Sequence, residues 1–175
     1  MSIETLFRIE LVGGYVAWLL VYGAWMLPWL GGMDRPQAHR VMAALHAFRF
    51  FGLAFILPGF VGHLPPGFAV SAAYGDFTAG VLAMLALAAF RVRPLFWGLV
   101  LAFNVVGVGD LVINYVNATR LNVPAMAGEF GASLVIPVLY VPILMITHVT
   151  ALWWLARRSP QGAARLTSPA TAGSR

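Results

Sequence analysis

The chain has 175 residues, of which 61% are hydrophobic and 10% are charged, and its mean hydropathy is +0.83. This composition is typical of a polytopic membrane protein and lies far from that of soluble domains. Cysteine is absent, which excludes disulfides, thiolate metal sites and cysteine nucleophiles. The pI near 10.5 does not indicate nucleic-acid binding, because the arginines lie mostly in short loops and no basic surface with stacking aromatic residues is present.

Five apolar segments are long enough to cross a membrane as helices, namely residues 11–30, 41–62, 68–90, 95–117 and 134–156. We therefore expect residues 1–156 to form one all-α bundle with five transmembrane helices. Four are expected if the first or third segment is re-entrant. Residues 157–175 are rich in Arg, Ser, Pro, Ala and Gly, which predicts a disordered tail.

The arginines outside the membrane are distributed unequally between the two sides that five spans define. Arg8 and Arg120 fall on the side of the N-terminus, whereas eight arginines fall on the other side: Arg35, Arg40, Arg91, Arg93, Arg157, Arg158, Arg165 and Arg175. The positive-inside rule then predicts an external N-terminus and a cytoplasmic tail. The expected location is a bacterial-type inner membrane, which the chain crosses several times.

Residues 103–117 are the most informative stretch. This part of an apolar segment carries Asn104, Asp110, Asn114 and Asn117 within one broad arc of a helix. Polar side chains inside a membrane are costly and usually face a protein interior or a water-filled cavity. Gly107 and Gly109 leave space beside this arc for a neighbouring helix or a ligand.

The rise of about 1.5 Å per residue converts position in a span into depth. It predicts an inner polar layer, about 9–15 Å from the cytoplasmic face, that contains His46, Arg49, Asn104 and His148. It also predicts an outer layer that contains His63, Asp76, Asp110, Asn114 and Glu129.

The first span carries aromatic residues at a spacing of 3-4-3-4, which places them on one side of a helix: Tyr15, Trp18, Tyr22, Trp25 and Trp29. Interfacial belts account for the ends of this stripe but not for Trp18 and Tyr22. The stripe is either a wall for a flat hydrophobic ligand or a surface for helix packing and lipid contact.

The leading functional hypothesis is a buried polar pocket for a lipophilic small molecule such as a quinone, a sterol-like lipid or a carotenoid. Five residues would bind the ligand: Asn104, Asn114, Asp76, Trp18 and Tyr22. Four would form the reactive group, with His46 or Asp110 as general acid or base: His46, Arg49, Asp110 and His148. The expected partners are the lipid bilayer, this ligand, and a membrane redox complex or further copies of the chain. Whether a reaction takes place stays open.

Two alternatives use the same residues. In the first, His46 and His148 are axial ligands of a haem b and Arg49 pairs with a propionate. In the second, Asp76, Asp110 and the two histidines form the proton relay of a proton-coupled transporter. The sequence contains no HExxH or GxSxG motif, so no zinc site or hydrolase nucleophile is predicted.

One family resemblance covers residues from about 46 to 115. The stretch RFFGLAFILPG, with Arg49, Gly52 and Gly59, and the stretch GDFTAG, with Asp76 and Gly80, resemble the DoxX-like family of small membrane proteins. The resemblance implies a compact helical bundle that in some members accompanies quinone-linked redox complexes. Asp76 stands where that family usually has glutamate, and the fifth span is an addition.

Overall fold

The structure, a computed structural model, describes residues 1–157, and in this range the chain is helical and contains no strand. The predicted disordered tail lies outside the described residues, apart from Arg157. The elements in chain order are α1 (Ile3–Val21), η1 (Tyr22–Met26), α2 (Leu27–Gly31), α3 (Arg35–His46), η2 (Ala47–Ile56), α4 (Pro66–Ala88), α5 (Arg93–Arg120), η3 (Val123–Leu134), η4 (Ile136–Tyr140) and α6 (Val141–Ala156).

Four helices are long and apolar enough to cross a membrane, which confirms the prediction of an all-α membrane bundle. They are Ile3–Gly31, Pro66–Ala88, Arg93–Arg120 and Ile136–Ala156. The remaining predicted span, residues 41–62, is not one α-helix. It consists of the end of α3, the 3₁₀ helix η2 and a turn, and α3 itself begins earlier because Asp34 caps it and accepts a hydrogen bond from the Gln37 N–H at 2.8 Å.

The 3₁₀ geometry of η2 has a direct consequence for the interior. A 3₁₀ helix has about three residues per turn, so residues three apart lie in one row. The buried residues of η2 are Arg49, Gly52 and Phe55, which follow this spacing. The 3₁₀ helix therefore directs one row of side chains, which includes Arg49, towards the centre of the bundle.

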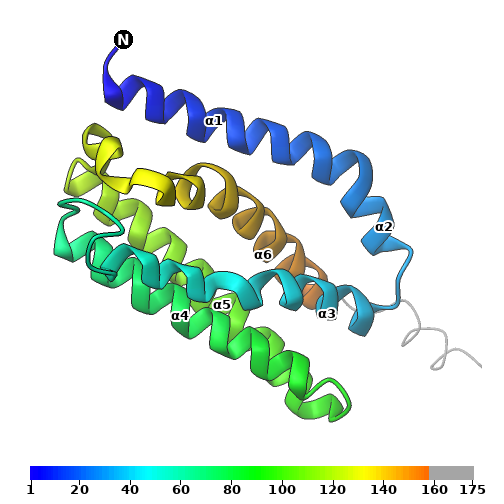
Figure 1. Ribbon diagram of the computed structural model, residues 1–175. Helices are drawn as coiled ribbons and strands as arrows, with labels where there is room; N and C mark the ends of the chain where they lie inside the picture. The colour runs from blue at the N-terminus through cyan, green and yellow to red at the C-terminus, as the bar shows by residue number, and fades with distance from the viewer. Residues whose placement is uncertain (158–175) are drawn as a thin grey trace, which may run out of the picture.

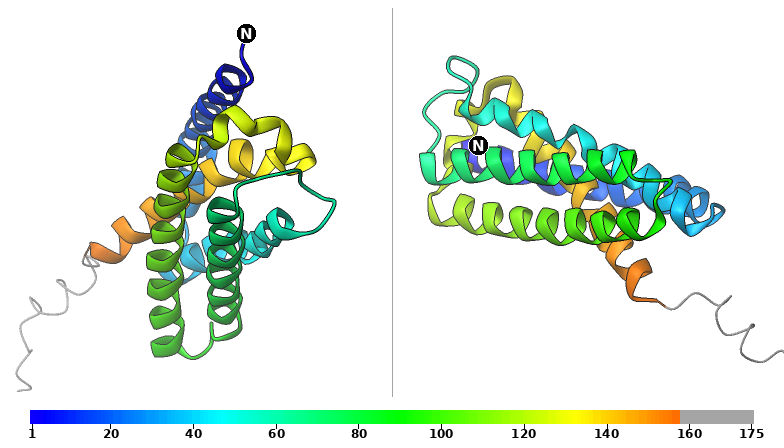
Figure 2. Two further views of the ribbon diagram at one scale, coloured as in Figure 1. Left: turned by 90° about the vertical axis from the view of Figure 1, so that its left-hand side faces the viewer. Right: turned by 90° about the horizontal axis from the view of Figure 1, so that it is seen from below.

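The chain runs along the bundle five times, as α1–α2, α3–η2, α4, α5 and η4–α6 (Figure 1). α4 and α5 form an antiparallel pair joined by a short turn (Figure 2). η2 packs on α4, α6 packs on α5, and α1 contacts α6, η4 and η3. α1 is thus a layer on the far side of α6 from α4.

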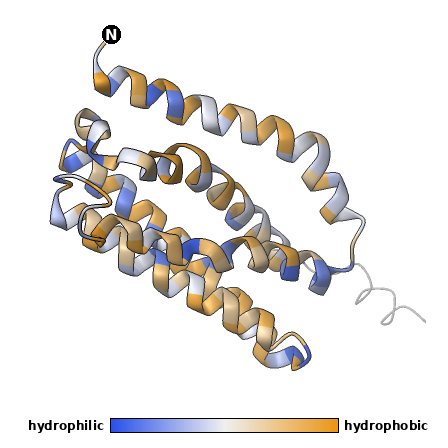
Figure 3. Ribbon diagram, in the orientation of Figure 1, coloured by the Kyte–Doolittle hydropathy of each residue, from blue (hydrophilic) through white to orange (hydrophobic). Residues whose placement is uncertain are grey.

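The outer surface is apolar along the helices, as a bilayer requires. Figure 3 shows hydrophobic residues along most of each helix and hydrophilic residues gathered mainly near the turns at both ends. Ala79 and Ala83 on α4 are completely buried, so small residues allow close helix contact there.

α1 is held to the η4–α6 segment by a close backbone approach. A Cβ atom on Gly14 would collide with the carbonyl oxygen of Val138. Pro142 has no N–H, so this carbonyl lacks the donor four residues on that an α-helix would supply. The indole N–H of Trp18 donates to the neighbouring Leu139 carbonyl at 2.7 Å.

Candidate functional site

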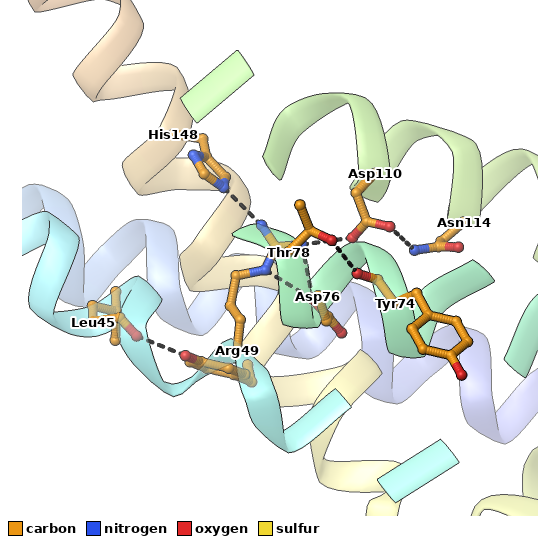
Figure 4. A network of polar contacts seen from close by, with 9 residues as sticks. Leu45, Arg49, Tyr74, Asp76, Thr78, Asp110, Asn114 and His148 are labelled. Atoms are coloured by element: carbon orange, nitrogen blue, oxygen red, sulfur yellow. Dashed lines mark hydrogen bonds and ion pairs between the residues drawn. The ribbon is translucent and has the colours of Figure 1, made fainter. Parts of the chain in front are cut away.

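Arg49 lies at the centre of the bundle and is completely buried. Its Nε donates to Asp76 Oδ1 at 2.8 Å, and its Nη2 lies 2.7 Å from Asp110 Oδ2 and 2.8 Å from Asp76 Oδ1 (Figure 4). The two carboxylates come from α4 and α5, and the guanidinium comes from η2. One arginine thus joins the three segments by charge-assisted hydrogen bonds.

His148 of α6 completes the contacts of Arg49. Arg49 Nη1 lies 2.9 Å from His148 Nε2, and because a guanidinium only donates, this ring nitrogen accepts. The proton of the neutral imidazole is then on Nδ1, which donates to Asn104 Oδ1 at 2.8 Å. The Asn104 amide in turn donates to the Val100 carbonyl at 2.7 Å, which fixes the orientation of both side chains.

The network continues along α5 in the other direction. Asn114 Nδ2 donates to Asp110 Oδ1 at 2.7 Å, one helical turn away. Hydrogen bonds and ion pairs therefore connect Asn104, His148, Arg49, Asp110 and Asn114 over ten residues of α5, about 15 Å of helix. The Asn114 Oδ1 atom is buried and has no partner among the described residues.

Three glycines make the space that the network occupies. A Cβ atom would collide with Asp76 at Gly52, with Asp110 at Gly75, and with His148 and Arg49 at Gly107. Gly109, which the sequence also suggested as a space beside the polar arc, has open surroundings instead.

His46 extends the cluster beyond Arg49. Its Nε2 lies 3.0 Å from Thr147 Oγ1, which donates its own proton to the Ile143 carbonyl at 2.7 Å, so His46 Nε2 is the donor. The other ring nitrogen, Nδ1, is buried without a partner in the described chain. The His46 ring lies against the His148 ring, with centroids 3.9 Å apart.

This arrangement does not favour a haem between His46 and His148. A bis-histidine haem needs the porphyrin plane between the two imidazoles, with one nitrogen of each directed to the iron. Here the two rings are in direct contact, and both nitrogens of His148 are engaged by Arg49 and Asn104.

The structure brings together seven of the residues selected from the sequence: His46, Arg49, Asp76, Asn104, Asp110, Asn114 and His148. It does not bring Trp18 and Tyr22 to them. Tyr22 is buried in a cluster with Met42 and Ile143, and Trp18 is bonded to the η4 carbonyl, so both serve the contact between α1 and its neighbours.

The division into two polar layers was wrong for the aspartates. Asp76 and Asp110 were assigned to an outer layer, yet both contact Arg49 directly. The extended side chain of Arg49 bridges the depth that separates their backbones. Sequence reasoning also missed Thr147, and it did not relate Gly52 or Gly75 to a carboxylate. Gly52 follows Arg49 by three residues, and this spacing was the available sign that both lie on one face of the helix.

The charges of the cluster do not balance. Arg49 carries one positive charge, whereas Asp76 and Asp110 carry two negative charges when both are ionised. The other titratable groups near the cluster are His46 from α3, His148 from α6 and Tyr140 from η4, whose hydroxyl donates to the Leu45 carbonyl. In a low-dielectric interior an uncompensated charge is costly, and one bound proton on the carboxylate pair removes it.

Comparison with known proteins gives a family but no activity. The resemblance to DoxX-like proteins stays a prediction. No curated protein and no solved structure matches the chain. One family profile, described as a domain of unknown function (DUF8737), matches residues 6–156 and so covers all five passes through the bundle. The chain belongs to this DUF8737 family.

Proposed function

We propose that the protein is a proton-coupled carrier of a bacterial-type inner membrane, in which the Arg49 cluster binds and releases one proton. The observation that carries the proposal is the pair of carboxylates, Asp76 and Asp110, on one completely buried guanidinium. The pair is neutralised by Arg49 and one proton together. Gain or loss of that proton changes the charge at the centre of the bundle by one unit.

Access to the pair from outside the cluster supports this function. The side chains of Asp76 and Asp110 are 8% and 6% exposed, whereas that of Arg49 is not exposed at all. The two carboxylates are therefore the charged groups of the cluster that a proton from outside can reach. His46 Nδ1, which has no partner among residues 1–157, is a further acceptor on a ring that lies against the His148 ring.

Infrared difference spectroscopy on the purified protein tests the proton site directly. A pH titration is expected to produce the carbonyl stretch of one protonated carboxylic acid. This band is lost in Asp110→Asn or Asp76→Asn and kept in Glu10→Gln, an exposed acid on α1 that serves as the matched control. The same band in all three variants, or no band in the wild type, contradicts the proposal.

Proton movement is tested with the protein in liposomes that contain a pH-sensitive dye. With no other solute present, the assay measures proton slip through the empty carrier: a potassium diffusion potential is expected to drive slow proton uptake through the wild type and through Glu10→Gln, but not through Asp110→Asn. Equal uptake in Asp110→Asn and the wild type contradicts a carrier that uses this carboxylate.

A second candidate function is a site for the polar end of a lipophilic ligand such as a quinone, beside a redox complex. Asn114 Oδ1, next to Asp110, favours it, since this buried acceptor has no partner within the described part of the chain and an unpaired acceptor is costly. Against the sequence hypothesis, both ends of the Asn104 amide are already bonded within the cluster. Mass spectrometry of co-purified lipids tests it: the ligand is expected to be lost in Asn114→Leu and kept in Asn117→Leu.

A further inference from the structure

The end of the bundle where α3 begins and α4 ends carries two arginines that converge on one aromatic ring. Arg40 of α3 and Arg93 of α5 both lie over the ring of Phe90, with their Cζ atoms 4.6 Å and 5.4 Å from its centroid. Among the described residues, neither forms an ion pair with a carboxylate. The acid of this end, Asp34, accepts the backbone N–H of Gln37 as the cap of α3.

Two guanidinium groups that converge on one ring repel each other, and an anion bound to both would offset this repulsion. The attraction of each cation to the ring face is about 0.5–1 kcal/mol at an exposed site. A negatively charged ligand would be attracted by both arginines, and both are exposed enough to meet one.

A groove that Arg40 lines gives the chemistry of the rest of the ligand, and Arg93 adjoins it through the shared Phe90 ring. Its volume is about 400 Å³, and its lining contains the polar Gln37 and Arg40 together with the apolar Val41, Ala44 and Leu87. The groove lies between α3 and α4, which run antiparallel (Figure 1). Its polar part is at the first turns of α3, and its apolar part continues towards the membrane interior.

We infer that this groove binds an anionic phospholipid, with the phosphate held by Arg40 and Arg93 and one acyl chain lying on Val41, Ala44 and Leu87. A head group explains the two unpaired cations, and an acyl chain explains the apolar floor that a free phosphate would leave empty. The site is separate from the Arg49 cluster and does not depend on proton transfer there.

Native mass spectrometry of the full chain in detergent tests the inference with two probes, dioleoyl phosphatidylglycerol and dioleoyl phosphatidylcholine. The wild type is expected to bind the anionic lipid preferentially. Each phospholipid contact of an arginine is worth about fivefold in affinity, so Arg40→Gln/Arg93→Gln should weaken binding by about 25-fold. Arg120→Gln, which removes one charge at the opposite end of α5, should leave binding unchanged.

A second variant separates a lipid site from a site for free phosphate. Ala44→Trp fills the groove and keeps both arginines, so it should abolish binding of phosphatidylglycerol, while inorganic phosphate should compete only weakly in the wild type. Thermal unfolding checks whether Ala44→Trp is folded. If it is not, Ala44→Leu is used in its place. Three results overturn the inference: equal binding of the two lipids, equal loss in Arg120→Gln, or full displacement by phosphate with binding retained in the groove-filling variant.

Discussion

Arg49 shows how a single side chain organises the interior of this membrane protein. Removing a guanidinium from water costs roughly several kcal/mol, and only partners with good geometry offset that cost. Arg49 has such partners on three different segments, in Asp76, Asp110 and His148. Its removal leaves both aspartates buried without a counter-charge, which is the basis of the first prediction.

Arg49→Met is expected to lower the free energy of unfolding by about 3–5 kcal/mol, the typical cost of breaking a buried ion pair by removing one partner. The triple variant Arg49→Met/Asp76→Asn/Asp110→Asn should recover most of this loss, because no uncompensated charge remains. Denaturation in detergent measures both. A triple variant as unstable as the single one would show that shape, rather than charge, is what Arg49 contributes.

Gly107 gives a second prediction at the scale of one residue. Gly107→Ala places a methyl group against the His148 ring and Arg49 Nη1, and overpacking of this kind costs about 1–3 kcal/mol. Gly109→Ala on the same helix meets nothing and should be neutral or up to about 1 kcal/mol stabilising, since alanine favours helix. Thermal unfolding compares the two, and equal midpoints would contradict the close contact at Gly107.

At the scale of elements, two irregular helices decide how the segments meet. η2 has 3₁₀ geometry and directs Arg49, Gly52 and Phe55 to one side. η4 is a π-helix that precedes Pro142, and the prolines of this segment leave carbonyl groups for α1 to approach. The attachment of α1 therefore depends on backbone contact as much as on apolar packing.

Gly14→Ala is expected to loosen α1, because its methyl group would collide with the Val138 carbonyl. The adjacent variant Gly13→Ala is a matched control, since its Cβ atom meets nothing. A loss of about 1–3 kcal/mol in the free energy of unfolding is expected for the first variant alone. Similar stability of the two variants would mean that α1 can shift away from η4 without cost.

At the scale of the whole molecule, the five passes place the turns at two ends of the bundle. Ser2, the residues 57–65 and η3 lie at one end, and the turns at 32–34 and 89–92 lie at the other (Figure 1). The distribution of arginines predicts that the second end is cytoplasmic. This orientation can be measured directly, because the chain contains no native cysteine.

Cysteines introduced at Ser2, His63 and Arg91 test this arrangement in intact cells with a membrane-impermeant thiol reagent. Ser2→Cys and His63→Cys should react at once, whereas Arg91→Cys should react only after permeabilisation. Labelling of Ser2→Cys and Arg91→Cys from outside, with His63→Cys protected, would mean that α3–η2 does not cross the membrane.

The fold could be predicted from the sequence because hydrophobic length alone defines a membrane-spanning helix. The prediction differed from the structure at residues 41–62, because hydropathy does not distinguish an α-helix from a 3₁₀ helix. Seven residues that the structure brings together were also selected from the sequence, since a polar group in an apolar segment is costly and therefore conspicuous. Trp18 and Tyr22 were predicted to lie in the same site, but the structure places them elsewhere. Periodicity shows which face of a helix is aromatic, but it does not show which helix lies opposite that face.

The sequence by itself determined that the chain is an all-helical membrane protein with polar residues buried in its spans, because each of these properties depends on the composition of one segment. Only the tertiary structure decided that Asp76 and Asp110 share Arg49. Depth counted along the backbone put these groups in separate layers, and a side chain as long as that of arginine reaches between them. The imbalance of charge at the centre of the bundle follows from that contact, so it belongs to the folded molecule and not to any one helix.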